Sequence, residues 1–123
     1  MPILEVEIVI RSNETLRDGL AGELANCCGE IFGSRPGTTW VKLKTIARDN
    51  YAENGGGMPE AVLPVFVSVL KAGHPAPDAL KLEADWLAHT VAQVCDRLPE
   101  NVHIIYLPEG AGRVAFGGKI IAR

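Results

Sequence analysis

The chain opens with the stretch that decides its fold: Met1-Pro2-Ile3-Leu4-Glu5-Val6-Glu7-Ile8-Val9. Leu4, Val6 and Ile8 alternate with polar positions, and this period of two is typical of a β-strand with one buried face and one polar face. Pro2 stands at the start of the strand, a position where proline is tolerated. The stretch therefore predicts a half-buried strand over residues 2–9.

A helix and a second strand are expected next. Ser12 or Asn13 is suited to cap the helix, and Gly33 and Pro36 are suited to end it. Between them, apolar residues recur at helical spacing at Leu16, Leu20, Leu24, Cys28, Ile31 and Phe32. The segment 38–46 alternates again, which predicts a strand. Its helix-facing residues would be Val41 and Leu43, with Trp40, Lys42 and Lys44 on the opposite face.

The second half of the chain repeats this order after a loop rich in turn formers, residues 49–59. A strand over 63–70, a helix beginning near Pro77 and a strand over 102–107 are predicted, followed by a glycine-rich tail with a short hairpin. The helix carries an apolar stripe of Leu80, Leu87, Val91, Val94 and Leu98, while Glu83 and Asp85 are expected on its solvated face.

Two equal offsets indicate an internal repeat. Pro64 lies 62 positions after Pro2, and Gly117-Gly118 lies 62 positions after Gly55-Gly56. We therefore predict one domain, 1–123, with a pseudo-repeat of about 1–61 and 62–123. The expected fold class is α/β (α+β): a duplicated β-α-β unit forming a four-stranded mixed sheet. Because each crossover is right-handed, both helices are expected on one face of that sheet.

The sheet face without helices is expected to be mixed in character. Its polar side chains are Glu5, Glu7, Lys42, Lys44 and His103, and the apolar side chains Trp40, Phe66 and Ile105 lie among them. Because exposed apolar patches commonly mark interaction sites, self-association is expected to cover this face.

Composition excludes several classes of function. The 123 residues fit one domain, and 47% hydrophobic with 22% charged residues indicates a folded, compact chain. With no apolar run near the roughly 18 residues of a membrane span and no signal-peptide pattern, we expect a cytoplasmic protein without a membrane partner. The net charge of −3 and the scattered basic residues argue against nucleic acid as a partner. Cys27, Cys28 and Cys95 lack metal-ligand spacing and are expected in the core.

Several features occur in a fixed order along the chain. They are Met1-Pro2 opening a strand, the doubled β-α-β unit, the junction Gly33-Ser34-Arg35-Pro36, the segment Pro99-Glu100-Asn101-Val102-His103-Ile104 and the tail Arg113-Val114-Ala115-Phe116-Gly117-Gly118. Over the whole chain this set resembles the tautomerase superfamily, whose members include 4-oxalocrotonate tautomerase and macrophage migration inhibitory factor. The resemblance implies a homotrimer with inward-facing sheets, active sites near subunit boundaries, a small carboxylate substrate, and chemistry without metal or cofactor.

The resemblance also gives Pro2 a chemical role, because an N-terminal proline is the general base of the family. If Met1 is removed, Pro2 carries a free secondary amine. Burial and nearby cations lower the pKa of such an amine below the ordinary α-amino range of about 7.7–8. Pro64 stands at the matching place in the second half but has no free amine, so its role is expected to be structural.

Five further residues are candidates for substrate binding. Arg35 falls where some family members carry a cation, and its guanidinium suits bidentate capture of a carboxylate; a solvated loop arginine is the alternative. Arg11 lies near the position of a substrate-binding arginine in the short tautomerases. Lys71 ends the third strand beside the expected pocket, with a surface loop residue as the alternative. Tyr106 and Phe116 would form an apolar wall, with core packing as the alternative.

The leading hypothesis is a cofactor-independent tautomerase or isomerase of a small 2-keto or enol carboxylic acid. The segment His74-Pro75-Ala76-Pro77 lacks the arginines that the dehalogenase and decarboxylase branches carry after the third strand. Two alternatives stay open: a hydratase, dehalogenase or decarboxylase that depends on Pro2, and a trimeric binding protein without catalysis. Retention of Met1 would favour the last of these, because it blocks the amine.

Overall fold

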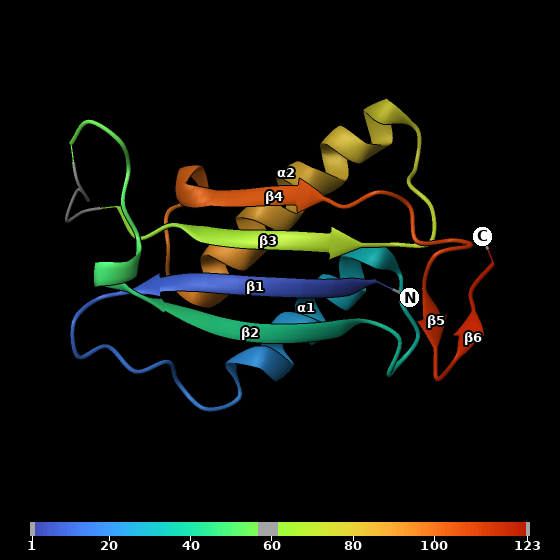
Figure 1. Ribbon diagram of the computed structural model, residues 1–123, viewed down its shortest axis with the longest axis horizontal. Helices are drawn as coiled ribbons and strands as arrows, with labels where there is room; N and C mark the ends of the chain where they lie inside the picture. Colours follow the sequence, from blue (N-terminus) through green and yellow to red (C-terminus); the bar gives the residue numbers. More distant parts are fainter. Residues whose placement is uncertain (1, 57–61, 123) are drawn as a thin grey trace.

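The computed structural model describes residues 2–56 and 62–122 (Figure 1). Its elements are β1 (Ile3–Ile10), α1 (Leu20–Phe32), β2 (Trp40–Ala47), β3 (Val65–Leu70), α2 (Pro77–Cys95), β4 (Val102–Tyr106), β5 (Ala115–Phe116) and β6 (Lys119–Ile120), with single 3-10 turns at Arg48–Asn50 and Pro99–Asn101. Met1 and part of the predicted connecting loop, Gly57-Met58-Pro59, lie outside the described residues. Within the described residues, no helix combines the length and apolar character needed to cross a membrane.

The described strands form a four-stranded mixed sheet in the order β2-β1-β3-β4, and β5 and β6 form a separate hairpin. β1 runs parallel to β2, β3 runs parallel to β4, and the central pair β1–β3 is antiparallel. Both helices lie on the same face of the sheet, behind the strands in Figure 1. The predicted fold class is therefore confirmed.

The two β-α-β units share the same strand register. Ile3 of β1 pairs with Trp40, and Val65 of β3 pairs with Val102, in both units a partner 37 positions further along the chain. An internal repeat would produce this shared register. The repeat boundaries near residue 61 remain a prediction.

The core lies between the sheet and the two helices. Leu4, Val6 and Ile8 are fully buried, as the alternation in the first strand predicts. They pack with further buried side chains of β3 and of the helices, among them Val65, Val67, Val69, Leu24, Leu87 and Val91. Two of the three cysteines, Cys28 and Cys95, lie in this core, but the prediction for Cys27 is wrong because that residue is half-buried.

Two predicted helix ends are wrong. The first helix begins at Leu20, not after Ser12 or Asn13, and Asn13 has a left-handed backbone with φ +66°. The segment before Leu20 is held by tertiary contacts instead, because Glu14 accepts hydrogen bonds from the side chain of Arg97 at 3.1 and 3.3 Å. At the other helix, α2 ends at Cys95, so Leu98 lies beyond the helix and is 56% exposed.

The sheet face opposite the helices carries the mixture of side chains that the alternation predicts. Trp40 is 49% exposed and Ile105 is 47% exposed. Phe66 is half-buried, and the ring of Tyr51 packs against it with centroids 6.0 Å apart. Phe116 of the hairpin packs on Trp40 with centroids 5.1 Å apart, so the tail covers part of the start of β2.

Candidate active site

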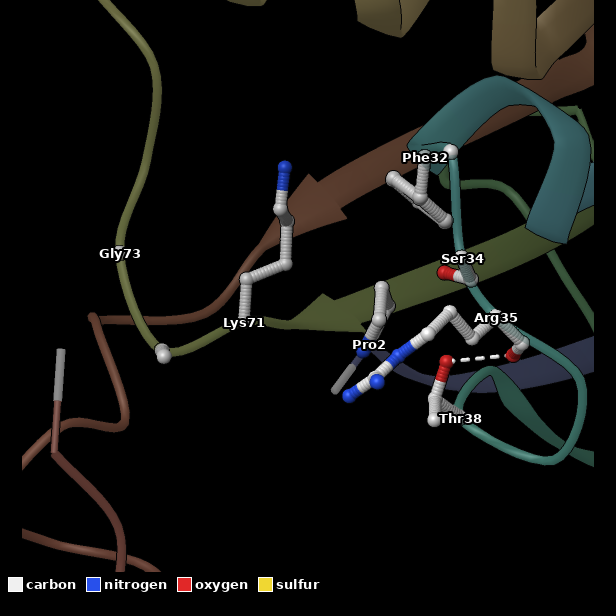
Figure 2. Close-up of a pocket in the computed structure, with 9 residues that line it drawn as sticks. Pro2, Phe32, Ser34, Arg35, Thr38, Lys71 and Gly73 are labelled. Carbon is white, nitrogen blue, oxygen red and sulfur yellow. Dashed lines mark hydrogen bonds between the residues drawn. The ribbon is translucent and has the colours of Figure 1, made fainter.

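A cavity of about 360 Å³ lies at the end of the two central strands where β1 begins and β3 ends (Figure 2). Antiparallel pairing of Ile3 with Leu70 brings these two strand ends together. Pro2 is buried at this place, and its carbonyl oxygen accepts a hydrogen bond from the backbone N–H of Trp40 at 3.0 Å. The cavity is lined by Pro2, Phe32, Gly33, Ser34, Arg35, Thr38, Lys71, Ala72 and Gly73.

The turn between α1 and β2 places Arg35 at this cavity. Gly33 ends the helix in a left-handed conformation, φ +63°, which a residue with a Cβ rarely adopts. After it, Thr38 closes the turn by donating to the carbonyl of Arg35 from both its backbone N–H, at 3.1 Å, and its hydroxyl, at 2.6 Å. The turn is therefore fixed at its backbone, while the side chain of Arg35 is left to extend.

The guanidinium of Arg35 points toward Pro2 in Figure 2. Arg35 is exposed, and within residues 2–56 and 62–122 its side chain has no hydrogen-bond or ion-pair partner. A guanidinium without a protein partner beside a cavity is suited to bind an anion of planar shape, such as a carboxylate.

Lys71 lies on another wall of the cavity and is paired. Its ammonium Nζ is 2.9 Å from Oε1 of Glu83 and lies 5.0 Å from the ring centroid of Phe32. The hydroxyl of Tyr106 donates to Oε2 of Glu83 at 2.8 Å. Burial, then this hydrogen bond and the charge of Glu83, raise the pKa of Tyr106, which keeps it a hydrogen-bond donor.

The other candidate residues do not line this cavity. Arg11 lies at the far end of β1 and lines a different cavity of about 290 Å³, with Arg97. Phe116 packs on Trp40, and Tyr106 bonds to Glu83, which in turn bonds to Lys71 of the cavity wall. The substrate-binding roles of these candidates therefore stay predictions, and one chain brings together only Pro2, Arg35 and Lys71.

Sequence reasoning missed Glu83. It was expected on a solvated helix face, but its side chain is 14% exposed and bonded to Lys71 and Tyr106. The spacing held a signal, because Glu83 stands three positions after Leu80 and four before Leu87, on the apolar stripe. An acidic residue on a buried stripe needs a partner, and Lys71 supplies it. Exposure of Asp85, by contrast, is confirmed.

The far end of the central strands contains a related arrangement. Arg97 stands 62 positions after Arg35, as Pro64 does after Pro2. The side chain of Arg97 is 4% exposed and donates to Glu14 and to the carbonyl of Val9, both at 3.1 Å. This arginine is therefore part of the scaffold.

Solved structures match the chain in fold. Macrophage migration inhibitory factor from Trichinella spiralis matches with a TM-score of 0.73 and 14% identity over 97% of this chain and 99% of that chain. A structure described as fused 4-OT wild type symmetric trimer matches with a TM-score of 0.75 and 15% identity, over 96% and 94%. Pt0534 inactivated by 2-oxo-3-pentynoate matches with a TM-score of 0.74 and 13% identity, over 96% and 94%.

No protein-family model matches the chain, and no curated protein matches it in sequence. The structural matches cover nearly all of the chain, and the fused 4-OT and inhibitory-factor structures are tautomerase-superfamily folds. The resemblance stated from the sequence is therefore confirmed at the level of the fold.

Proposed function

We propose that the protein is a cofactor-independent tautomerase of a small 2-oxo or enol carboxylic acid, and that the amine of Pro2, freed by removal of Met1, is its general base. One observation carries the proposal: buried Pro2 and the guanidinium of Arg35, which no described residue pairs, line the same cavity. This combination places a candidate base beside a candidate carboxylate anchor.

The reaction needs only a proton shuttle. Arg35 binds the carboxylate of the enol acid and orients it. The nitrogen of Pro2 takes the proton from the enol oxygen and returns a proton to carbon, so the carbonyl forms and no atom is gained or lost. In the chain without Met1, burial and the charge of Arg35 would both disfavour the ammonium form of the amine and so favour the unprotonated form, which acts as the base.

We propose a homotrimer whose subunits meet across the open sheet face. Exposed Trp40 and Ile105 on that face support association. One structure of the same fold is described as a symmetric trimer, and another as inactivated by a 2-oxo acid, 2-oxo-3-pentynoate. Sedimentation of the purified protein is expected to give the mass of three chains, and a monomer at micromolar concentration would contradict the assembly.

The test compares the two prolines that open the repeated strands. Intact mass first establishes that Met1 is absent. Pro2→Ala is then expected to lower kcat/KM for ketonisation of phenylpyruvate, an acid with a single carboxylate, by about 10²-fold or more, the usual contribution of a general base. Pro64→Ala, in a fully buried position, is expected to lower stability and keep turnover.

Unchanged turnover in Pro2→Ala would refute the role of Pro2. A mature chain that keeps Met1 and binds 2-oxo acids without converting them would indicate a binding protein. A pH–rate profile separates the base from an acid: turnover should rise with pH as Pro2 loses its proton, and a fall over the same range would favour the hydratase or decarboxylase chemistry.

A further inference from the structure

The two cations of the cavity differ in how their charge is compensated. Arg35 has no partner among the described residues, whereas Lys71 is paired with Glu83 at 2.9 Å. The side chains of Lys71 and Glu83 are 18% and 14% exposed, so solvent screens this pair far less than a surface ion pair. Of the residues that line the cavity, Arg35 and Lys71 are the two with ionisable side chains.

Glu83 is held firmly in this position. Both of its carboxylate oxygens are used, Oε1 by the ammonium of Lys71 and Oε2 by the hydroxyl of Tyr106. The backbone of Glu83 belongs to the 19-residue helix α2, and Tyr106 is the last residue of β4. The carboxylate is thus fixed by a helix on one side and a strand on the other.

We propose that Glu83 is a specificity-determining residue, which restricts the cavity to acids with a single carboxylate; this inference rests on the proposed function. A first carboxylate binds Arg35, which no carboxylate among the described residues occupies. A second carboxylate reaching Lys71 meets Glu83, which already neutralises that ammonium and repels another anion. Displacing a fixed internal carboxylate exchanges one ion pair for another while desolvating an additional charge, so the dicarboxylate gains nothing from Lys71.

The experiment uses two acids that differ in one carboxylate, 2-oxohexanoate and 2-oxohexanedioate. Their dissociation constants are measured by NMR titration of the mature ¹⁵N-labelled protein. Exchange of deuterium at C3 of each acid in D₂O is recorded in parallel as the catalytic readout. The chains compared are wild type, Glu83→Gln, the double variant Lys71→Met/Glu83→Gln, Asp85→Asn and, for the exchange readout, Pro2→Ala.

Wild type is expected to bind 2-oxohexanoate about tenfold more tightly than 2-oxohexanedioate. Glu83→Gln keeps the shape of the side chain but frees the charge of Lys71, so it should shift the ratio of the two constants toward the diacid by about tenfold, the size of one charge-assisted hydrogen bond. Asp85→Asn removes the same charge from an exposed position of the same helix, and should leave the ratio unchanged.

The double variant tests the same idea without an uncompensated charge. If the Lys71–Glu83 pair adds no net charge, removing both members should keep the affinity for 2-oxohexanoate within about threefold and keep the selectivity. Circular dichroism establishes whether each variant is folded. If Glu83→Gln does not fold, the double variant decides whether Lys71 or Arg35 anchors the first carboxylate.

Two results would overturn the role of Glu83. The first is that Glu83→Gln leaves the ratio of the two dissociation constants at the wild-type value. The second is that the double variant no longer binds 2-oxohexanoate, which would make Lys71 the carboxylate anchor. Failure of the proposed function looks different. In that case both acids bind with the expected ratio, and C3 exchange in wild type is no faster than in Pro2→Ala.

Discussion

At one end of the β1–β3 pair, the guanidinium of Arg35 extends toward an open cavity beside Pro2. At the other end Arg97, 62 positions further along the chain, is 4% exposed and bonded to Glu14. The two arginines occupy matching places after the two helices. What separates them is a carboxylate: Glu14 lies against Arg97, while no described residue supplies one to Arg35.

The comparison shows that an arginine at the same place in the repeat can be structural at one end of the sheet and available to a ligand at the other. Arg97 joins the segment before α1 to the end of α2, donating also to the carbonyls of Val9 and Cys95. The charge of Arg97 is therefore neutralised inside the fold and is not available to a ligand. The contact between Glu14 and Arg97 also illustrates inside this protein how a carboxylate meets a guanidinium, and we expect a substrate carboxylate to make an equivalent contact with Arg35.

The largest expected effect comes from removing the scaffold arginine. Arg97→Gln removes a buried guanidinium that donates to the carboxylate of Glu14 and to the carbonyls of Val9 and Cys95, so the free energy of unfolding should fall by about 3 kcal/mol. Urea denaturation measures this loss, and turnover of the folded fraction should stay at the wild-type value. A stability loss under about 0.5 kcal/mol would break the comparison, because Arg97 would then be no more structural than a surface residue.

Arg35→Gln should have the opposite profile. Loss of a charge-assisted hydrogen bond to the substrate should lower kcat/KM for phenylpyruvate by about 10- to 100-fold, mainly through KM. Because no described residue pairs with its side chain, the free energy of unfolding should change by less than about 0.5 kcal/mol. Kinetics and urea denaturation of one preparation test the effects on activity and on stability. A kcat/KM at the wild-type value in this variant would show that Arg35 does not bind the substrate.

The smallest expected effects sharpen the comparison at the two helix ends. Both helices end in a left-handed residue, Gly33 after α1 and Asp96 after α2, with φ +63° and +56°. Gly33→Ala should cost about 1 kcal/mol, entirely from the backbone, because a Cβ there meets no atom within 4 Å. Asp96→Gly should stabilise by about 0.5 kcal/mol. If thermal unfolding gave a stability change of the same sign for both variants, side-chain contacts rather than backbone strain would determine stability at these positions.

Strands were the easiest elements to predict, because a sheet with one buried face imposes a period of two on the sequence. Leu4, Val6 and Ile8 follow that period and are fully buried. The start of α1 was predicted wrongly for a tertiary reason. Ser12 and Asn13 are good caps, and Leu16 has helical spacing, but the contact between Glu14 and Arg97 holds this segment in another conformation.

The candidate site was predicted only in part. Pro2, Arg35 and Lys71 were named as candidates through the resemblance to the family, and all three line one cavity. The antiparallel pairing of β1 with β3, which brings Pro2 and Lys71 together, comes from the structure. The place of Glu83 on the apolar stripe indicated that it needs a partner, but not which one, since Lys71 is 12 positions away, just beyond the end of β3. The same offset of 62 separates Arg35 from Arg97, but an offset alone does not tell which of the two arginines is bonded to a carboxylate.

By itself, then, the sequence determined the order of the elements, the buried face of β1 and the place of Pro2 at the start of that strand. These features follow from periodicity and turn residues, which act over a few neighbouring positions. The tertiary structure alone decided which charges are left over. Glu14 neutralises Arg97, and Glu83 neutralises Lys71, through contacts between elements that are distant in the chain. Arg35 is left as the available cation beside Pro2 because the fold brings no described carboxylate to it.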